Sequence, residues 1–351
     1  PARAPTATPA PTETAGSTAT PTPTATATAE PTATPAVGDV VGEYRCPDPE
    51  GDPDITVAGD GSGDYETVGA AVEAVPDADP EETLVAIEAG RYEEKLEVPR
   101  RKVNVTFVGA GAGETVLTYD DHADKTDDQG RTLGTGRSAS FVAAGPDFTA
   151  ANLTFENAAE PVAQAVAARV DGDRAAFVNC RFLGNQDTLY TQAPVRQYYR
   201  DCYVEGDVDF IFGAATAYFR GCELFCKEDG GYVTAASTPR TADYGYVFDG
   251  CRVTADGAGD DSFYLGRPWR PYAQTVFMNS YLGDHIHPKG WDNWDDPSKE
   301  ETASYAEYGN EGPGYTPDRR VEWASQLSDY LASQHAEVET VLDGWNPEDC
   351  L

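Results

Sequence analysis

Short runs of alternating apolar and polar residues recur along the chain at nearly regular intervals. Each run begins with aromatic or apolar residues, continues with Asn, Asp or Gly and a small residue, and ends in alternating apolar positions. The clearest runs are AFVNCRFLG (176–184), YYRDCYVEG (198–206), YFRGCELFC (218–226), VFDGCRVTA (247–255) and VFMNSYLGD (276–284). Alternation favours strands, and such a repeat without intervening helical patterns predicts a parallel β-solenoid.

The expected fold is therefore all-β, a right-handed parallel β-helix in which the longer intervals contain loop insertions. The small residues in the middle of the runs are expected to point inward as a core ladder, formed by Cys180, Cys202, Cys222, Cys251 and Ser280. Stacked cysteines on neighbouring coils lie within disulfide range, so the sequence allows a disulfide between Cys202 and Cys222 without requiring it. The sequence leaves open whether Cys46 and Cys350 meet.

Both ends of a solenoid need a cap, and the sequence offers a helical pattern near each end. In residues 64–75, DYETVGAAVEAV, apolar side chains recur at helical spacing, which predicts a short N-terminal capping helix. The segment TPDRRVEWASQLSDYLASQ, which starts at Thr316, predicts a C-terminal helix with Thr316 as N-cap and Pro317 at its first position. Its apolar stripe would be Val321, Ala324, Leu327 and Leu331.

Composition divides the chain into a linker at residues 1–40 and a folded domain at 41–351. The first segment is almost entirely Thr, Pro and Ala, which predicts a disordered spacer. The sequence starts without Met, so we expect that a targeting segment was removed and that the protein is secreted, with the linker as a means of surface attachment. No apolar run approaches the ~18 residues of a membrane span.

The charge balance excludes some partners. Asp and Glu number 60 against 25 Lys and Arg, a net charge of −35, which argues against nucleic-acid binding. Strong self-repulsion is tolerable in concentrated salt, so we expect a halophilic microbial source. We also expect a monomer.

Three pairs of residues share one and the same spacing along the chain: Gln164 with Gln186, Asp187 with Asp209, and Cys180 with Cys202. If this spacing is one coil, each pair stacks on neighbouring strands roughly 4.8 Å apart. Two carboxylates at such a distance do not both ionise easily, which separates them into a proton donor and a charged carboxylate.

Arg267, in LGRPW, is the cation expected to keep one aspartate ionised. The paired glutamines offer amide donors suited to an oxyanion, although an amide ladder within the solenoid explains their spacing equally.

Several segments in order resemble the pectin methylesterases. They are GRYEE (90–94), QAVAAR (164–169), GNQDTLY (184–190), DFIFG (209–213), LGRPW (265–269), PKGWDNW (288–294), YAEYGNEGPG (305–314) and WNP (345–347). The resemblance covers roughly residues 52–347. It implies a β-helix with a shallow aromatic cleft that converts methyl-esterified polygalacturonate (pectin) to pectate and methanol, without metal or other cofactor.

The same resemblance implies a role for each residue. Asp209 looks like the nucleophile and Asp187 like the acid and base. Arg267 would orient Asp209, and Gln164 with Gln186 would stabilise the oxyanion. Aromatic residues expected to stack on galacturonate rings are Trp269, Tyr190, Phe210 and Trp291.

Other interpretations remain open at this stage. A serine hydrolase is disfavoured because no G-x-S-x-G motif occurs. A Ca²⁺-dependent β-helix lyase could use acidic clusters such as Asp260–Asp261. A non-catalytic carbohydrate-binding solenoid, or an esterase for other esters or thioesters, would share the fold.

Overall fold

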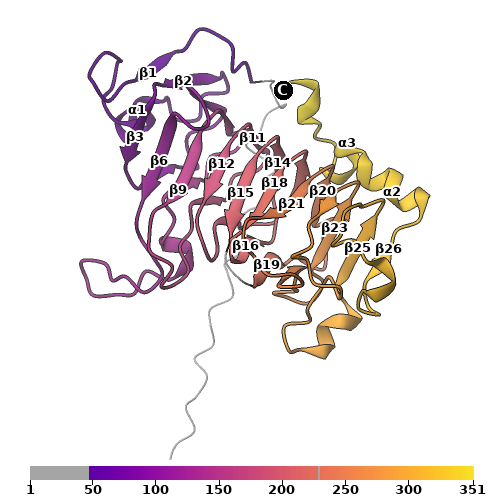
Figure 1. Cartoon of the computed structure of the whole chain (residues 1–351). Coiled ribbons are helices and arrows are strands. Elements are labelled where there is room, and N and C mark those ends of the chain that lie inside the picture. Colours follow the sequence, from indigo (N-terminus) through magenta and orange to yellow (C-terminus); the bar gives the residue numbers. More distant parts are fainter. Residues whose placement is uncertain (1–46, 228–229) are drawn as a thin grey trace, which may run out of the picture. The chain divides into compact units, whose positions relative to one another are not determined.

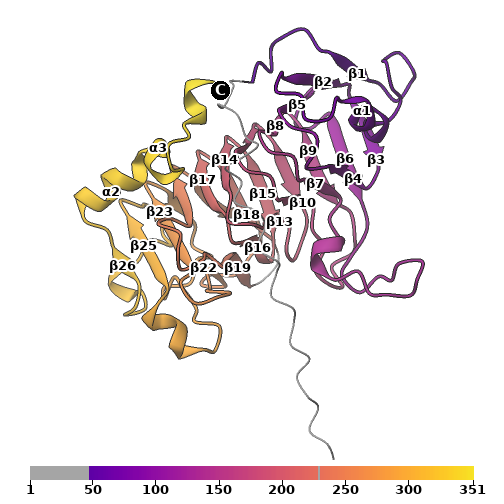
Figure 2. The ribbon, with the colours of Figure 1, turned by 180° about the vertical axis from the view of Figure 1, so that it is seen from behind.

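The computed structural model describes residues 47–227 and 230–351; the predicted linker and Cys46 lie outside them. The described strands wind into three parallel sheets, so the prediction of a parallel β-helix is confirmed (Figures 1 and 2). The largest sheet contains β1 (Ile55–Val57), β2 (Thr83–Ile87), β5 (Val105–Gly109), β8 (Thr149–Ala151), β11 (Ala175–Val178), β14 (Arg196–Arg200), β17 (Thr216–Arg220), β20 (Tyr246–Asp249), β23 (Gln274–Met278), β25 (Ser304–Tyr308) and β26 (Ser325–Gln326).

The second sheet contains β3 (Gly90–Glu93), β6 (Thr115–Tyr119), β9 (Thr154–Asn157), β12 (Arg181–Leu183), β15 (Tyr203–Gly206), β18 (Glu223–Cys226), β21 (Arg252–Ala255) and β24 (Tyr281–Leu282). The third contains β4 (Leu96–Val98), β7 (Phe141–Ala143), β10 (Ala168–Val170), β13 (Leu189–Thr191), β16 (Val208–Gly213), β19 (Gly231–Ala236) and β22 (Phe263–Gly266). We call this seven-stranded sheet the site sheet, because the cleft described below lies on its outer face.

A left-handed residue forms each corner between the largest sheet and the second one. The corner residue is the Asn, Asp or Gly of the repeat, with φ between 49° and 66° at Asn179, Asp201, Gly221, Gly250 and Asn279. Only Gly, and to a lesser degree Asn and Asp, adopts this conformation readily. The Asn, Asp or Gly that recurs in the sequence therefore marks a left-handed backbone turn that occurs once per coil.

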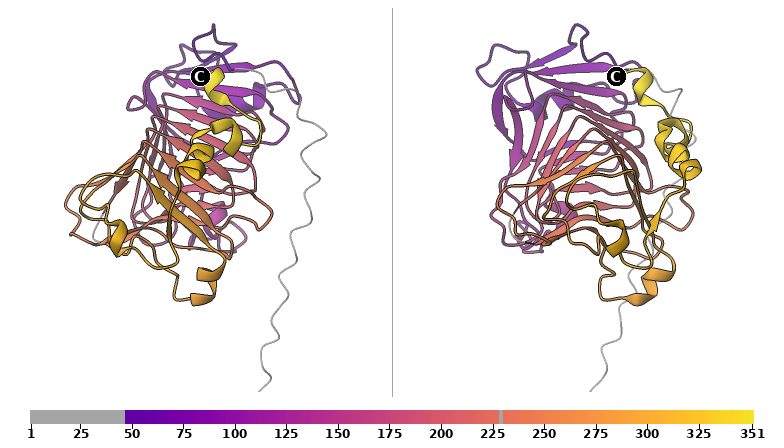
Figure 3. Two further views of the ribbon diagram at one scale, coloured as in Figure 1. Left: turned by 90° about the vertical axis from the view of Figure 1, so that its right-hand side faces the viewer. Right: turned by 45° about the vertical axis from the view of Figure 1, so that its right-hand side comes forward.

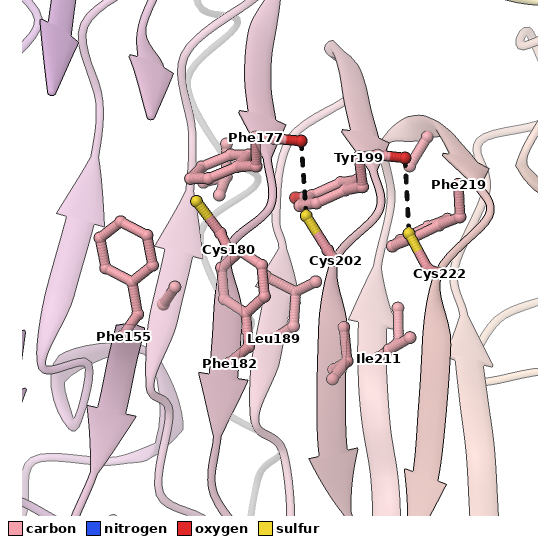
Figure 4. Close-up of a cluster of buried hydrophobic side chains, with 14 of the residues drawn as sticks. Phe155, Phe177, Cys180, Phe182, Leu189, Tyr199, Cys202, Ile211, Phe219 and Cys222 are labelled. Carbon is pink, nitrogen blue, oxygen red and sulfur yellow. Dashed lines mark hydrogen bonds between the residues drawn. The ribbon is translucent and has the colours of Figure 1, made fainter. Parts of the chain in front are cut away.

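The small residue after each corner points into the core, as predicted. Cys180, Cys202, Cys222 and Cys251 are buried and free. Cys202 Sγ donates to the carbonyl of Phe177 at 3.4 Å, and Cys222 Sγ donates to that of Tyr199 at 3.5 Å (Figure 4). The Cys202–Cys222 bridge, which the sequence left open, is not formed: both cysteines are free, and each thiol is directed at a carbonyl of the preceding coil. Cys350 is disulfide-bonded.

Aromatic rings fill the space beside the thiols. Phe177, Tyr199, Phe219, Phe248 and Phe277 occupy equivalent positions on five coils and stack in one column, with neighbouring centroids 5.1, 4.5, 4.5 and 4.4 Å apart. Each ring is completely buried. The core is thus a repeated layer, in which every coil stabilises the next through ring and backbone contacts.

The N-terminal capping helix is confirmed, although it is shorter than predicted. Helix α1 spans Val68–Ala74, and the Thr67 side chain accepts a hydrogen bond from the Ala70 amide as N-cap. Val68 and Val72 are buried against the first coils. Tyr65 instead belongs to a bridge with Val57, which is why the helix starts later.

The helix predicted from Thr316 is wrong over its first half. A single 3-10 turn, η4 (Pro317–Arg319), is followed by strand β26, which pairs with β25. Arg320 forms a buried ion pair with Glu307 of β25, with 2.5 Å between Nε and Oε1, and this contact holds the segment extended.

The C-terminal helical segment begins later, at α2 (Asp329–Ala336), with Ser328 as its N-cap, and continues in α3 (Val338–Val341). Figure 3 shows both helices along the outside of the coil. Val338 and Val341 pack with Tyr218 of the largest sheet, whereas Leu331 is 45% exposed. Three further 3-10 turns are η2 (Thr135–Arg137), η3 (Pro297–Glu301) and η5 (Pro347–Asp349). No helix in the described part of the chain is long and apolar enough to cross a membrane.

Candidate active site

Two aspartates lie next to each other where adjacent coils enter the site sheet. Asp187 precedes β13 and Asp209 lies within β16; these strands pair with Tyr190 opposite Phe212. Both aspartates adopt the left-handed conformation, with φ of 66° and 53°. The Asp187 amide donates to the carbonyl of Val208 at 3.1 Å. The register predicted from the common spacing is therefore present between these coils.

All five residues predicted to act in catalysis line one cleft of about 260 Å³. Gln164 and Gln186 come from adjacent coils, because the amide of Ala165 donates to the carbonyl of Gln186 at 3.1 Å. Arg267 reaches the cleft from the loop after β22. The remaining wall consists of Thr135, Gly136, Tyr190, Phe212, Ala235, Trp269 and Trp294.

Arg267 forms a bidentate ion pair with Asp209 through its guanidinium. Its Nε donates to Oδ1 at 2.8 Å and its Nη2 donates to Oδ2 at 2.7 Å. The guanidinium is also sandwiched between two rings, with Cζ 3.7 Å from the Tyr232 centroid and 3.8 Å from that of Trp294. A bidentate and stacked arginine has little freedom, so it fixes the orientation of the carboxylate.

The two carboxyl groups differ in their proton affinity. Burial, reinforced by the negative charge of Asp209, raises the pKa of Asp187 to about 8. Burial also raises the pKa of Asp209, but the hydrogen bonds and charge of Arg267 oppose that rise. Asp187 therefore holds its proton more strongly than an ordinary carboxyl group does, whereas Arg267 favours the charged form of Asp209.

The two glutamines present neutral donors to the same space. Gln164 and Gln186 are half-buried, and neither side-chain amide hydrogen-bonds to another described residue. Their N–H groups are therefore available to a ligand in the cleft.

An aromatic platform extends from the carboxylates. Tyr190 stacks on Phe212 with centroids 4.2 Å apart, and Phe212 meets Trp269 edge-on at 6.0 Å. Tyr190 and Trp269 are half-buried on the cleft wall, where sequence reasoning placed them. Phe212, Tyr232 and Trp294 were not predicted; the first lies at the outward position two residues after Phe210.

Two of the predicted sugar-binding aromatics are wrong. Phe210 is completely buried, because the chain turns inward immediately after Asp209. Trp291 is 1% exposed and packs in the core against Phe277 and Tyr305, at centroid distances of 6.0 and 4.6 Å. Trp294 takes the cleft position three residues later.

A larger hollow of about 630 Å³ lies near α1 and β3, among acidic side chains such as Glu66 and Glu94. Its lining includes no amide side chain, and its one arginine, Arg91, pairs with Glu156, which does not line the hollow. We therefore assign the site to the smaller cleft. Among the described residues, no group of three or more His, Cys, Asp or Glu side chains is placed to hold a metal ion.

A parallel β-helix with this carboxyl pair, arginine and amide pair on its outer face defines a β-helix carboxylic ester hydrolase. The Pectinesterase family profile matches residues 54–343, and the chain belongs to this family.

Pectinesterase 31 from Arabidopsis thaliana is 42% identical over 281 residues, which are 78% of this chain and 88% of that protein. Other curated relatives are longer, and the chain spans about half the length of several of them. Among solved structures, pectin methylesterase from carrot superposes with a TM-score of 0.76 at 36% identity, covering 84% of this chain and 94% of that one. A pectin methylesterase in complex with a hexasaccharide matches with a TM-score of 0.76 at 29% identity, covering 85% of this chain and 99% of the other.

Proposed function

We propose that the cleft removes methyl esters from polygalacturonate by covalent catalysis, with Asp209 as the nucleophile. The observation behind this proposal is the bidentate Arg267–Asp209 pair beside the buried carboxyl group of Asp187, whose pKa is raised to about 8. An ionised carboxylate and a neighbouring carboxylic acid are the two groups that such an ester cleavage needs.

The first half of the reaction transfers the acyl group to the enzyme. A carboxylate oxygen of Asp209 attacks the ester carbonyl and forms a tetrahedral oxyanion. When this intermediate collapses, the C–O bond to the methoxy group breaks, and Asp187 gives its proton to the departing oxygen, so that methanol leaves. The galacturonyl group remains joined to Asp209 as a mixed anhydride.

The second half restores the enzyme. Asp187, now a carboxylate, takes a proton from a water molecule as that water attacks the galacturonyl carbon. The bond to Asp209 breaks, so that Asp209 is again a carboxylate and Asp187 again carries a proton. The product leaves as the carboxylic acid, which releases its proton to the solvent and becomes galacturonate. A single acid–base residue serves both halves because it loses a proton in the first and regains one in the second.

Stabilisation of the oxyanion falls to the free amides of Gln164 and Gln186. Neutral donors suit this task, because they favour the developing charge without attracting a second anion in the ground state.

The wall around Trp269 and Trp294 supports binding of an acidic polysaccharide. Arg270 lies over the ring of Trp269 at 4.6 Å, and Lys299 lies over that of Trp294 at 5.3 Å. Neither cation forms an ion pair with a carboxylate in the described ranges. In a protein with a net charge of −35, these cations favour galacturonate carboxylates near the cleft.

Methanol release from methylated pectin tests the proposal. Asp209→Asn should lower kcat by about 10⁴-fold or more, because the amide is a far weaker nucleophile, while the fold and pectin binding remain. Asp249→Asn is the matched control, since Asp249 is also buried and paired with an arginine, Arg220, at 2.8 Å on the largest sheet. Its kcat should stay within twofold. Full turnover by Asp209→Asn would refute the nucleophile.

The secreted location, the halophilic source and the monomeric state stay predictions.

A further inference from the structure

One lysine holds the turn from which Gln186 and Asp187 emerge. Lys227 follows β18, two coils beyond that turn. Its Nζ donates to the carbonyl of Gly184 at 3.0 Å, to Oδ1 of Asn185 at 2.8 Å and to Glu205 at 3.3 Å. An ammonium group has three N–H donors, so every donor of Lys227 is in use.

The hydrogen-bond network around Lys227 extends across four coils, the fourth of them through Asn185. Its own amide donates to the carbonyl of Gly206 at 2.8 Å, which ties it to the coil that leads to Asp209. Asn185 Nδ2 donates to the carbonyl of Ala159 at 3.4 Å, on the coil that leads to Gln164. The network therefore touches each of the three coils just before they deliver a catalytic group to the cleft.

Lys227 does not touch the cleft itself, since it is absent from the cleft lining. Its side chain is only 29% exposed and that of Glu205 is 20% exposed, so these hydrogen bonds are partly shielded from water. The ammonium of Lys227 is held by one backbone carbonyl and two side-chain oxygens, and a partly buried charge bound in this way fixes geometry more than it adds stability.

We propose that Lys227 is a positioning residue, whose ammonium sets where Gln186 and Asp187 stand relative to Asp209. This inference depends on the proposed function, because the placement matters only if those groups perform the chemistry. Without the ammonium, the carbonyl of Gly184 and the side chain of Asn185 lose their donor, and the turn is free to shift outward. Asp187 would then lie farther from Asp209 and nearer to water.

The test is the steady-state kinetics of Lys227→Met, a substitution that keeps length but removes the charge. We expect kcat to fall at least tenfold with KM changed less than threefold. The alkaline limb of the pH profile should move to lower pH, because burial and the charge of Asp209 are what raise the pKa of Asp187. Lys227→Arg should recover part of both effects.

Lys102→Met is the matched control. Lys102 also donates to backbone carbonyls, those of Glu73 and Val75, and pairs with Asp77 at 2.7 Å, but it does so at the capping helix. That variant should lose thermal stability and keep both kcat and the pH profile. A kcat within twofold of wild type and an unmoved alkaline limb in Lys227→Met would overturn the inference.

Two further outcomes are informative. If Lys227→Met does not fold, Asn185→Ala removes the central acceptor and should lower kcat more than threefold with the same shift of the alkaline limb; an unchanged profile overturns the inference. The proposed function fails separately, through an active Asp209→Asn. An inactive Asp209→Asn together with a fully active Lys227→Met would reject only the role of Lys227.

Discussion

The inner and outer faces of the same strands follow different rules. Inside, Leu189 and Ile211 sit opposite each other on β13 and β16 and are completely buried among apolar neighbours. Outside, Tyr190 and Phe212 occupy the next register position and face the cleft. The inner face repeats from coil to coil, whereas the outer face departs from the repeat where charged groups appear. The functional site is therefore a local departure from the repeat on the outer face, whereas the inner face that supports it stays regular.

The two faces also differ in what they do for stability. The inner aromatic column gains from every contact and contains no charge. The outer face keeps a carboxyl group whose pKa is raised to about 8, which means that ionising it in the folded protein is unfavourable. The outer face therefore keeps a group that lowers stability because catalysis needs it. Substitutions on the outer face should change activity, and substitutions on the inner face should change stability.

Among the substitutions that compare the two faces, Asp187→Asn should have the largest effect. Loss of the proton donor should lower kcat by about 10²–10⁴-fold. The folded pKa of Asp187 lies above its ordinary value of 3.8, so wild type loses stability as pH rises from about 4 to 8. The variant lacks this loss, and its melting temperature should exceed that of wild type by several degrees at pH 8 and match it near pH 4. A lower melting temperature at pH 8 would contradict the opposition between the faces.

The inner face should show the reverse pattern. Phe177→Ala removes one ring from the column and should lower the free energy of unfolding by about 3–5 kcal/mol, because the cavity is enclosed by rings on both neighbouring coils. Denaturant unfolding measures this loss. At a temperature where the variant is folded, kcat should stay within twofold of wild type; a tenfold fall would mean that the core layer also sets site geometry.

The smallest effect is a contrast between two tryptophans. Trp269→Ala should raise KM for pectin roughly two- to tenfold, which corresponds to roughly 0.5–1.5 kcal/mol of ring contact, without changing the melting temperature. Trp291→Ala should do the opposite and destabilise the fold while leaving KM unchanged, because Trp291 is buried. Equal changes in KM in the two variants would contradict the assignment of substrate binding to the outer face alone.

Sequence reasoning succeeded where a spacing was enough. The interval shared by three residue pairs matched Asp187 with Asp209, because one coil is one repeat and adjacent strands pair in register. It failed for Phe210 and Trp291, since nothing in a motif tells which way a ring points. In PKGWDNW the choice depends on a loop in which the Trp294 amide donates to the Asp292 carboxylate and Trp294 has a φ of 60°.

The C-terminal error has a different cause. The apolar spacing after Thr316 is genuinely helical, but helix propensity is a weak preference that tertiary contacts override. Here the contacts are the Arg320–Glu307 ion pair and the pairing of β26 with β25. Neither is local in sequence, so no pattern within the segment could reveal it. Ser328, the N-cap of α2, marks where local preference prevails again.

The left-handed corners have a consequence for redesign. Each coil is closed by one residue of fixed conformation, and successive repeats still stack although they differ in length. Extra residues in the connections that leave the site sheet need not disturb the stacking of the coils, because the left-handed corner residue returns the backbone to the same path in every coil. The rim of the cleft could therefore be lengthened, trimmed or exchanged between relatives to alter polymer preference, with the catalytic groups left in place.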